Sequence, residues 1–67
     1  SIKKIKFDKN SIYNKKLNCL PNGLSTLQLP DIYNHQIHSI PKSLTKLMCS
    51  KYYPYINDFA GIEIETY

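Results

Sequence analysis

The residues that could carry chemistry in this sequence are few and widely separated. Two histidines, His35 and His38, lie three positions apart, a spacing at which two imidazoles could hold one metal ion. A zinc site needs a third or fourth ligand at a fixed spacing, and the sequence offers no such cluster. We therefore expect both histidines to be surface residues, and we predict no metal site and no cofactor.

The two cysteines, Cys19 and Cys49, occupy non-equivalent positions of the repeat described below. Their Cα atoms are therefore not expected within the roughly 7 Å that a disulfide requires. We predict two free thiols and a reducing compartment, with Cys49 as a small buried hydrophobe. The alternative is a nucleophilic Cys49 beside a histidine.

Carboxylates offer no catalytic pair, because Asp8, Asp31 and Asp58 are isolated in the sequence and do not share a repeat position. No glycine-rich stretch could cradle a phosphate. We predict no catalytic residue, no small-molecule substrate and a protein that is not an enzyme.

The net charge of +4 comes from lysine alone, since the 67 residues contain no arginine. A basic segment can attract nucleic acid, although a solvated lysine-coated face is the explanation that we favour. Arginine's bidentate grip, common in base and phosphate readout, is missing. Weak nucleic-acid binding remains an alternative, through the six lysines of the first sixteen residues: Lys3, Lys4, Lys6, Lys9, Lys15 and Lys16.

The composition also bears on the source and the location of the protein. Ile, Lys, Asn and Tyr, whose codons are AT-rich, supply 30 of the 67 residues, which indicates an AT-rich genome. No run approaches the roughly 18 apolar residues of a membrane helix, and no signal peptide opens the chain. We expect a cytoplasmic protein, or one inside a virus particle assembled in the cytoplasm. Because the first residue is Ser1, we expect part of a longer protein.

The elements that position these residues are repeats with a step of about 20 residues. Segment 21–29 recurs as 41–49, and segment 13–21 recurs as 33–41, while 1–7 is an earlier copy of the first pattern. Each copy reads apolar-x-x-apolar-x-apolar and ends in a period-two segment, which predicts a short strand with one buried face. Such units cannot cover their own apolar face and must stack.

We therefore predict a mainly β and irregular repeat solenoid, a leucine-rich-repeat-like stack of about three rungs with short parallel strands and little helix. Four of its ladders are Ile2/Leu24/Leu44, Ile5/Leu27/Leu47, Phe7/Leu29/Cys49 and Tyr13/Tyr33/Tyr53. The alternative is an amphipathic helix through Leu24, Leu27 and their copies, for which four prolines leave little room.

The predicted boundaries follow the repeats. Residues 1–57 form the repeat region, divided into 1–21, 22–41 and a degraded third unit, 42–57. Residues 58–67 are predicted to be a closing edge strand or tail, because apolar and polar residues alternate from Ile62 onward. Glu63 and Glu65 would discourage another strand from adding there.

The candidate partner-binding face consists of outward-pointing strand residues, since the sheet face of a solenoid is its usual binding surface. Among them, Met48 is expected to be an exposed apolar contact point beside Lys46 and its neighbours. The predicted face comprises Lys4, Lys6, Asp8, Thr26, Gln28, Lys46 and Met48.

The repeated residues resemble the FNIP repeat family. Segments 20–27 and 40–47 are similar to its IPxSLTxL core, and segments 13–17 and 33–37 to its FNxPI element, with Tyr13 and Tyr33 in place of Phe. The resemblance implies leucine-rich-repeat relatives of about 22 residues, found in social amoebae and in giant viruses of amoebae. Family members often carry an F-box ahead of the repeats, but these 67 residues contain none.

Three hypotheses on function follow. The first is a protein–protein interaction module that binds a protein partner or assembles with itself. The second is a small structural subunit of a virion or complex. The third is the lysine-dependent nucleic-acid binding described above.

Overall fold

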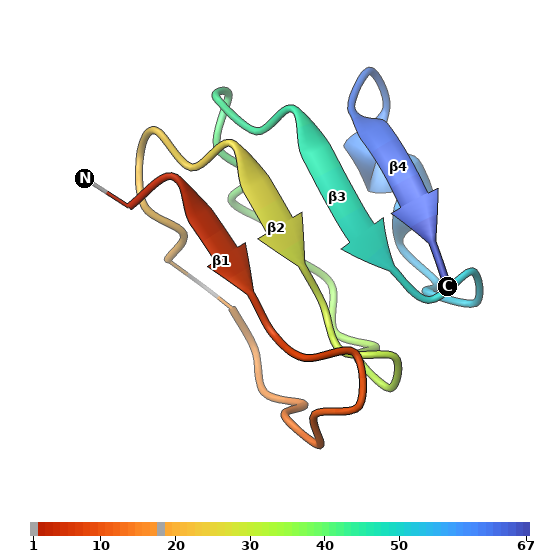
Figure 1. The fold of residues 1–67 in the computed structure, drawn as a ribbon. Helices are drawn as coiled ribbons and strands as arrows, with labels where there is room; N and C mark the ends of the chain where they lie inside the picture. The colour runs from red at the N-terminus through yellow and green to blue at the C-terminus, as the bar shows by residue number, and fades with distance from the viewer. Residues whose placement is uncertain (1, 18) are drawn as a thin grey trace.

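The computed structural model describes residues 2–17 and 19–67 and contains one four-stranded sheet in which neighbouring strands run parallel. The strands lie side by side in chain order, as Figure 1 shows. Helix is limited, in the part of the chain described, to the short 3-10 helix η1. The element bounds are β1 (Lys4–Lys6), β2 (Thr26–Gln28), β3 (Lys46–Cys49), η1 (Ile56–Phe59) and β4 (Glu63–Thr66).

Equivalent residues of successive units are paired across the sheet. Ile5 pairs with Leu27, and Leu27 pairs with Leu47, so this predicted ladder is confirmed. Ile64 of β4 extends the ladder by one further residue. Because Leu27 and Leu47 lie in strands, the alternative of an amphipathic helix is wrong.

Three return segments connect the strands, and their described residues, 7–17 with 19–25, 29–45 and 50–62, pass on the same side of the sheet (Figure 1). Apolar side chains fill the space between them and the sheet. Leu27 and Leu47 are fully buried there. The other buried core residues are Leu24, Leu29, Tyr33, Ile37, Leu44, Cys49, Tyr53 and Phe59.

A row of aromatic rings lines the return segments. Phe7 stacks on Tyr13 with ring centroids 4.6 Å apart, and Tyr33 lies 6.4 Å from Tyr13 and 6.1 Å from Tyr53. The predicted tyrosine ladder is therefore confirmed. Such ring pairs add roughly 0.5–1.5 kcal/mol beyond the area that they bury.

The buried tyrosine hydroxyls bind backbone groups of the preceding return segment. The Leu17 amide donates to the Tyr33 hydroxyl at 3.2 Å, and the Tyr53 hydroxyl donates to the His35 carbonyl at 2.6 Å. Each hydrogen bond is partly buried, and a bond of this kind contributes about 0.5–1.5 kcal/mol to stability. Successive return segments are joined by both ring packing and hydrogen bonds.

The two ends of the stack are less buried than its middle. Leu27 and Leu47 are 0% exposed, whereas Ile5 and Ile64, at the two ends of the same ladder, are only half-buried. The difference arises because each end residue has a neighbouring strand on one side only. Among the described residues, the ladder is therefore most buried at the two central strands.

No helix among the described residues is both long and apolar enough to pass through a membrane.

Leu27→Ala should destabilise the fold severely, because Leu27 is fully buried and contacts a strand on each side. A buried Leu→Ala change costs roughly 2–5 kcal/mol, a large share of what a chain this short can gain from its core. Urea unfolding followed by circular dichroism should show no folded baseline or a strongly lowered midpoint. Thr26→Ala, on the adjacent outward position, is the control and should shift the midpoint far less; equal losses would contradict the core assignment.

Candidate functional site

The outer face of the sheet, defined as the face opposite the buried Leu27 and Leu47, carries most of the predicted binding residues. Strand register places them in two rows across the four strands. The rows are Lys4, Thr26, Lys46 and Glu63, and Lys6, Gln28, Met48 and Glu65. Asp8 lies two residues beyond β1, where its carboxylate accepts a hydrogen bond from the Asn10 amide at 2.8 Å and holds a turn.

The expectation that Met48 is an exposed contact point is wrong, since this side chain is only 8% exposed. Met48 lies on the inner strand β3, where Gln28 of β2 and Glu65 of β4 flank it on both sides. Beyond it along the chain, the Tyr67 amide donates to the Cys49 carbonyl at 3.0 Å, and the Tyr67 hydroxyl donates to the Leu29 carbonyl at 2.9 Å. The ring must therefore cross the end of β3 to reach the end of β2. Ser50, next to this crossing, is also buried.

Charge is distributed unevenly over the outer face. Lys4 and Lys6 are exposed on β1, whereas Glu63 and Glu65 are exposed on β4. The Lys46 ammonium lies 3.8 Å from a carboxylate oxygen of each of these glutamates. Exposed ion pairs of this kind contribute little stability, typically about 0–1 kcal/mol. The positions of these lysines and glutamates make the outer face basic at the β1 edge and acidic at the β4 edge.

Sequence reasoning missed a row of exposed apolar residues at the turns after the first three strands. Ile12, Ile32 and Tyr52 are 89%, 51% and 80% exposed. The signal was present in the sequence, because each of them directly precedes a residue of the tyrosine ladder. Exposed apolar side chains thus occupy equivalent positions in three successive units.

The histidines behave differently from one another. His38 is exposed, as expected, but His35 is half-buried and its Nε2 lies 2.9 Å from the Asn14 carbonyl. Because a carbonyl only accepts, Nε2 must carry the proton. Asn14 also accepts a hydrogen bond through its side chain, from the Asn34 amide at 3.3 Å. His35 therefore joins two return segments. Residues 2–17 and 19–67 hold no group of three His, Cys, Asp or Glu that could bind a metal ion.

Both thiols are free, as predicted, and their environments differ. Cys19 is exposed, whereas Cys49 is buried in the core. Burial raises the pKa of the Cys49 thiol to about 11. A thiol kept protonated is a poor nucleophile, so Cys49 has a structural role.

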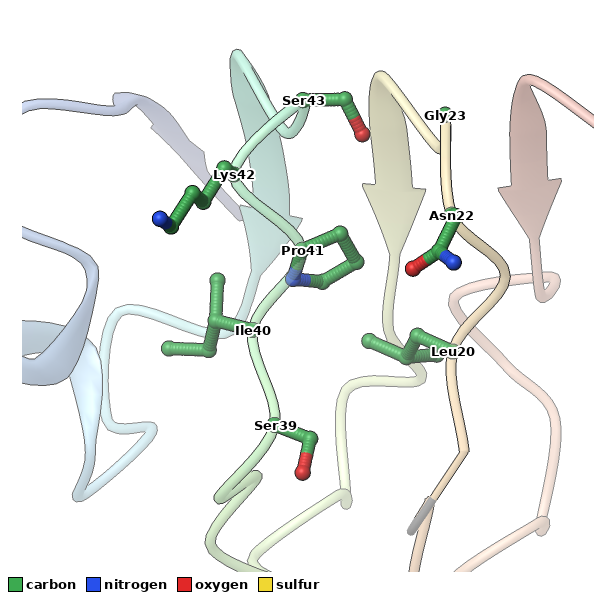
Figure 2. A pocket seen from close by; sticks show the side chains of 8 residues that line it. All are labelled: Leu20, Asn22, Gly23, Ser39, Ile40, Pro41, Lys42 and Ser43. Atoms are coloured by element: carbon green, nitrogen blue, oxygen red, sulfur yellow. The ribbon is translucent and has the colours of Figure 1, made fainter.

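An open hollow of about 520 Å³ lies between the turns that precede β2 and β3 (Figure 2). Figure 2 shows the side chains of Leu20 and Asn22 pointing toward Pro41. The Ser43 hydroxyl donates to the Leu24 carbonyl at 2.7 Å, and Lys42 is the titratable residue of the lining. The lining of this hollow is mixed, with both polar and apolar side chains. Its remaining lining residues are Gly23, Ser39 and Ile40.

Thiol labelling should separate the two cysteines. Iodoacetamide at neutral pH should modify Cys19 rapidly, because it is exposed, and Cys49 only as fast as the fold opens, because it is buried and protonated. Mass spectrometry should find one label on the native chain and two in concentrated urea. Cys19→Ser should abolish the fast reaction, and a fast label on Cys49 would contradict the burial described.

Alkaline pH should weaken the fold, because burial raises the pKa values of Cys49, Tyr33, Tyr53 and Tyr67 above their ordinary 9.0 or 10.0. Above pH 9.0 the unfolded thiol loses its proton while the folded thiol keeps it until about pH 11. The unfolded chain then binds fewer protons, so stability is complete below pH 9.0 and falls as the pH rises.

The urea midpoint measured across this range tests the expectation. It should decline from pH 9.0 upward, and Cys49→Ala should have a lower midpoint that depends less on pH between 9.0 and 10.0. A midpoint unchanged between pH 8 and about 11 would contradict it.

Comparison with known proteins supports the resemblance seen in the repeats. The model of the family described as FNIP Repeat matches residues 13–52 of the 67. No curated protein and no solved structure gives a match. The matched region contains β2 and β3, with their ladder residues Leu27 and Leu47. It also contains the return segment between these strands, with Tyr33. The chain therefore belongs to the FNIP repeat family.

Proposed function

We propose that this chain is a protein–protein interaction module, a short leucine-rich-repeat-like solenoid of about three rungs that binds a partner protein with the outer face of its sheet. The observation that carries the proposal is the lack of any layer over that face in the described part of the chain. All three return segments pass on the opposite side (Figure 1).

The uncovered face is the one that repeat solenoids use for binding. In α/β proteins, by contrast, sheets made only of parallel strands are covered on both faces. Here one face packs on the core, while the other carries the partly exposed side chains of Thr26, Gln28 and Lys46. A partner protein would supply the second layer.

The composition of the surface fits a protein partner. Interfaces combine apolar anchors with a polar rim. The exposed row Ile12, Ile32 and Tyr52 offers anchors at the ends of the strands. The polar rows of the outer face offer hydrogen-bond donors and acceptors that recur at every strand, roughly 4.8 Å apart.

A specific interface covers about 800 Å² of each partner. The strands are only three or four residues long, so an interface of that size must extend from the outer face onto the exposed row Ile12, Ile32 and Tyr52. The mixed charge of the face favours protein over nucleic acid, because Glu63 and Glu65 would repel phosphates near the lysines.

Selection from a phage-displayed random-peptide library tests the proposal. The wild-type chain should enrich peptides that bind it, and the double variant Thr26→Arg, Gln28→Arg should bind these peptides at least about tenfold more weakly, because two large charged side chains then occupy the centre of the face. The control His38→Arg, Ser39→Arg adds the same charge at exposed positions of a return segment.

Equal binding by wild type and the Thr26, Gln28 variant would contradict the use of this face. Binding to a DNA or RNA duplex that is stronger than peptide binding and falls steeply with salt would favour nucleic acid instead.

A further inference from the structure

We infer that Asn22 is a site of spontaneous chemical modification, at which the backbone amide of Gly23 closes a ring on the Asn22 side chain and the asparagine becomes aspartate or isoaspartate. The site lies in the turn that precedes β2. It is independent of which protein the outer face binds.

The neighbour of Asn22 in the sequence makes this reaction possible. Of the six asparagines in the chain, Asn22 alone is followed by glycine. Ring closure brings the backbone nitrogen of the following residue against the side-chain carbon Cγ of the asparagine, and a side chain on that residue hinders the approach. Glycine has none. The space around Gly23 is also open, since a Cβ placed there would have no atom within 4 Å.

The turn leaves the reacting groups accessible. The Leu24 amide donates to the Pro21 carbonyl at 3.2 Å and closes a four-residue turn with Asn22 and Gly23 at its centre. Gly23 has a φ of 90°, as the third residue of a type II turn requires. Within residues 2–17 and 19–67, no backbone carbonyl accepts a hydrogen bond from the Gly23 amide. Both central residues are exposed, and both line the open hollow of Figure 2.

The reaction consumes water and releases ammonia. Hydroxide removes the proton of the Gly23 amide, and the nitrogen attacks Cγ of Asn22. The new N–Cγ bond forms, the Cγ–Nδ2 bond breaks, and ammonia leaves with a proton taken from water. The product is a cyclic succinimide, and water then opens it at one of its two carbonyl carbons.

The two openings give two products of equal mass. Cleavage of the bond between the nitrogen and Cγ gives aspartate. Cleavage of the bond between the nitrogen and the main-chain carbonyl carbon gives isoaspartate, in which the backbone runs through the former side chain. In both products a neutral amide has become a carboxylate, so the net charge of +4 falls by one.

Other parts of the chain provide contrasts. The Asn14 side-chain oxygen accepts a hydrogen bond from the Asn34 amide at 3.3 Å, and both asparagines are followed by residues with long or bulky side chains. The turn before β3 repeats the closing bond, from the Leu44 amide to the Pro41 carbonyl at 3.1 Å. Its central residues are lysine and serine, so it lacks the reactive pair.

Isoaspartate would loosen the start of β2. It adds one atom to the backbone inside the turn that the bond between Leu24 and Pro21 closes. Leu24 is 0% exposed, and its carbonyl accepts a hydrogen bond from the Ser43 hydroxyl at 2.7 Å. A longer turn must therefore displace a core residue or break the closing bond. Aspartate adds no backbone atom and leaves the turn intact.

Incubation of the purified chain at body temperature tests the inference. The pH should be mildly alkaline but below 9.0, where the fold keeps its full stability. Cation exchange separates the products by charge, and tandem mass spectrometry of tryptic peptides locates them. Asn22 should lose its amide at least about tenfold faster than Asn14 or Asn34, which corresponds to a barrier lower by about 1.4 kcal/mol. The rate should rise with pH, because the attacking nitrogen must lose its proton.

The stability of the products tests the structural consequence. The isoaspartate fraction should unfold at a lower urea concentration than the unreacted chain. The variant Asn22→Asp carries the same charge without the extra backbone atom, and its urea midpoint should stay near that of the unreacted chain.

Two variants serve as chemical controls. Asn22→Gln keeps an exposed amide but would have to close a larger ring, so position 22 should stay unreacted. The double variant Lys42→Asn, Ser43→Gly places the reactive pair in the equivalent turn before β3, and position 42 should then react as well. Circular dichroism should show that both variants are folded.

Three results would overturn the inference. The first is an Asn22 that reacts no faster than Asn34. The second is a reaction at position 22 that continues at the same rate in Asn22→Gln. The third is an isoaspartate fraction with the same urea midpoint as Asn22→Asp.

Discussion

The structure depends on the parallel, in-register pairing of equivalent apolar residues. Ile5, Leu27, Leu47 and Ile64 form one continuous ladder across all four strands. Since alternate strand residues point to opposite faces, a slip of one residue would move Leu27 to the outer face and Gln28 into the core. The same register aligns the outward residues, so the core and the candidate binding face are fixed together.

The return segments reinforce this register with polar contacts. The Tyr33 hydroxyl accepts from the Leu17 amide, the Tyr53 hydroxyl donates to the His35 carbonyl, and His35 itself binds the Asn14 carbonyl. Each contact joins one return segment to the one before it. A segment that shifted along its neighbour would lose ring packing and leave buried polar groups unpaired, which is costly. Residues of the return segments, outside the candidate binding face, thus help to position the residues of the outer face.

Most of the features that were predicted correctly recur from one unit to the next, although the closing strand β4, which occurs once, was also predicted. The Leu27 and tyrosine ladders and the burial of Cys49 follow from comparing each unit with the next. The burial of Met48 could not be predicted from alternation along one strand, because Met48 is flanked by residues of both β2 and β4. Equally, Lys15 stands at the position of His35 in the preceding unit, so the repeat gave no hint that this histidine is half-buried. The exposed residues Ile12, Ile32 and Tyr52, one before each ladder tyrosine, recur in the sequence. They were missed because the binding face was predicted from the alternation of residues along the strands, and these residues lie after the strands.

The equivalence of successive units also bears on how such a chain changes over evolutionary time. Because residues 20 positions apart make the same contacts, excising 22–41 from the gene would bring Ile5 beside Leu47 and Tyr13 beside Tyr53, pairs of the kind already present. Duplication of the same stretch would likewise insert a strand that fits both neighbours. The interface between units is thus inherited along with each copy, so the length of the array can vary without a newly evolved core.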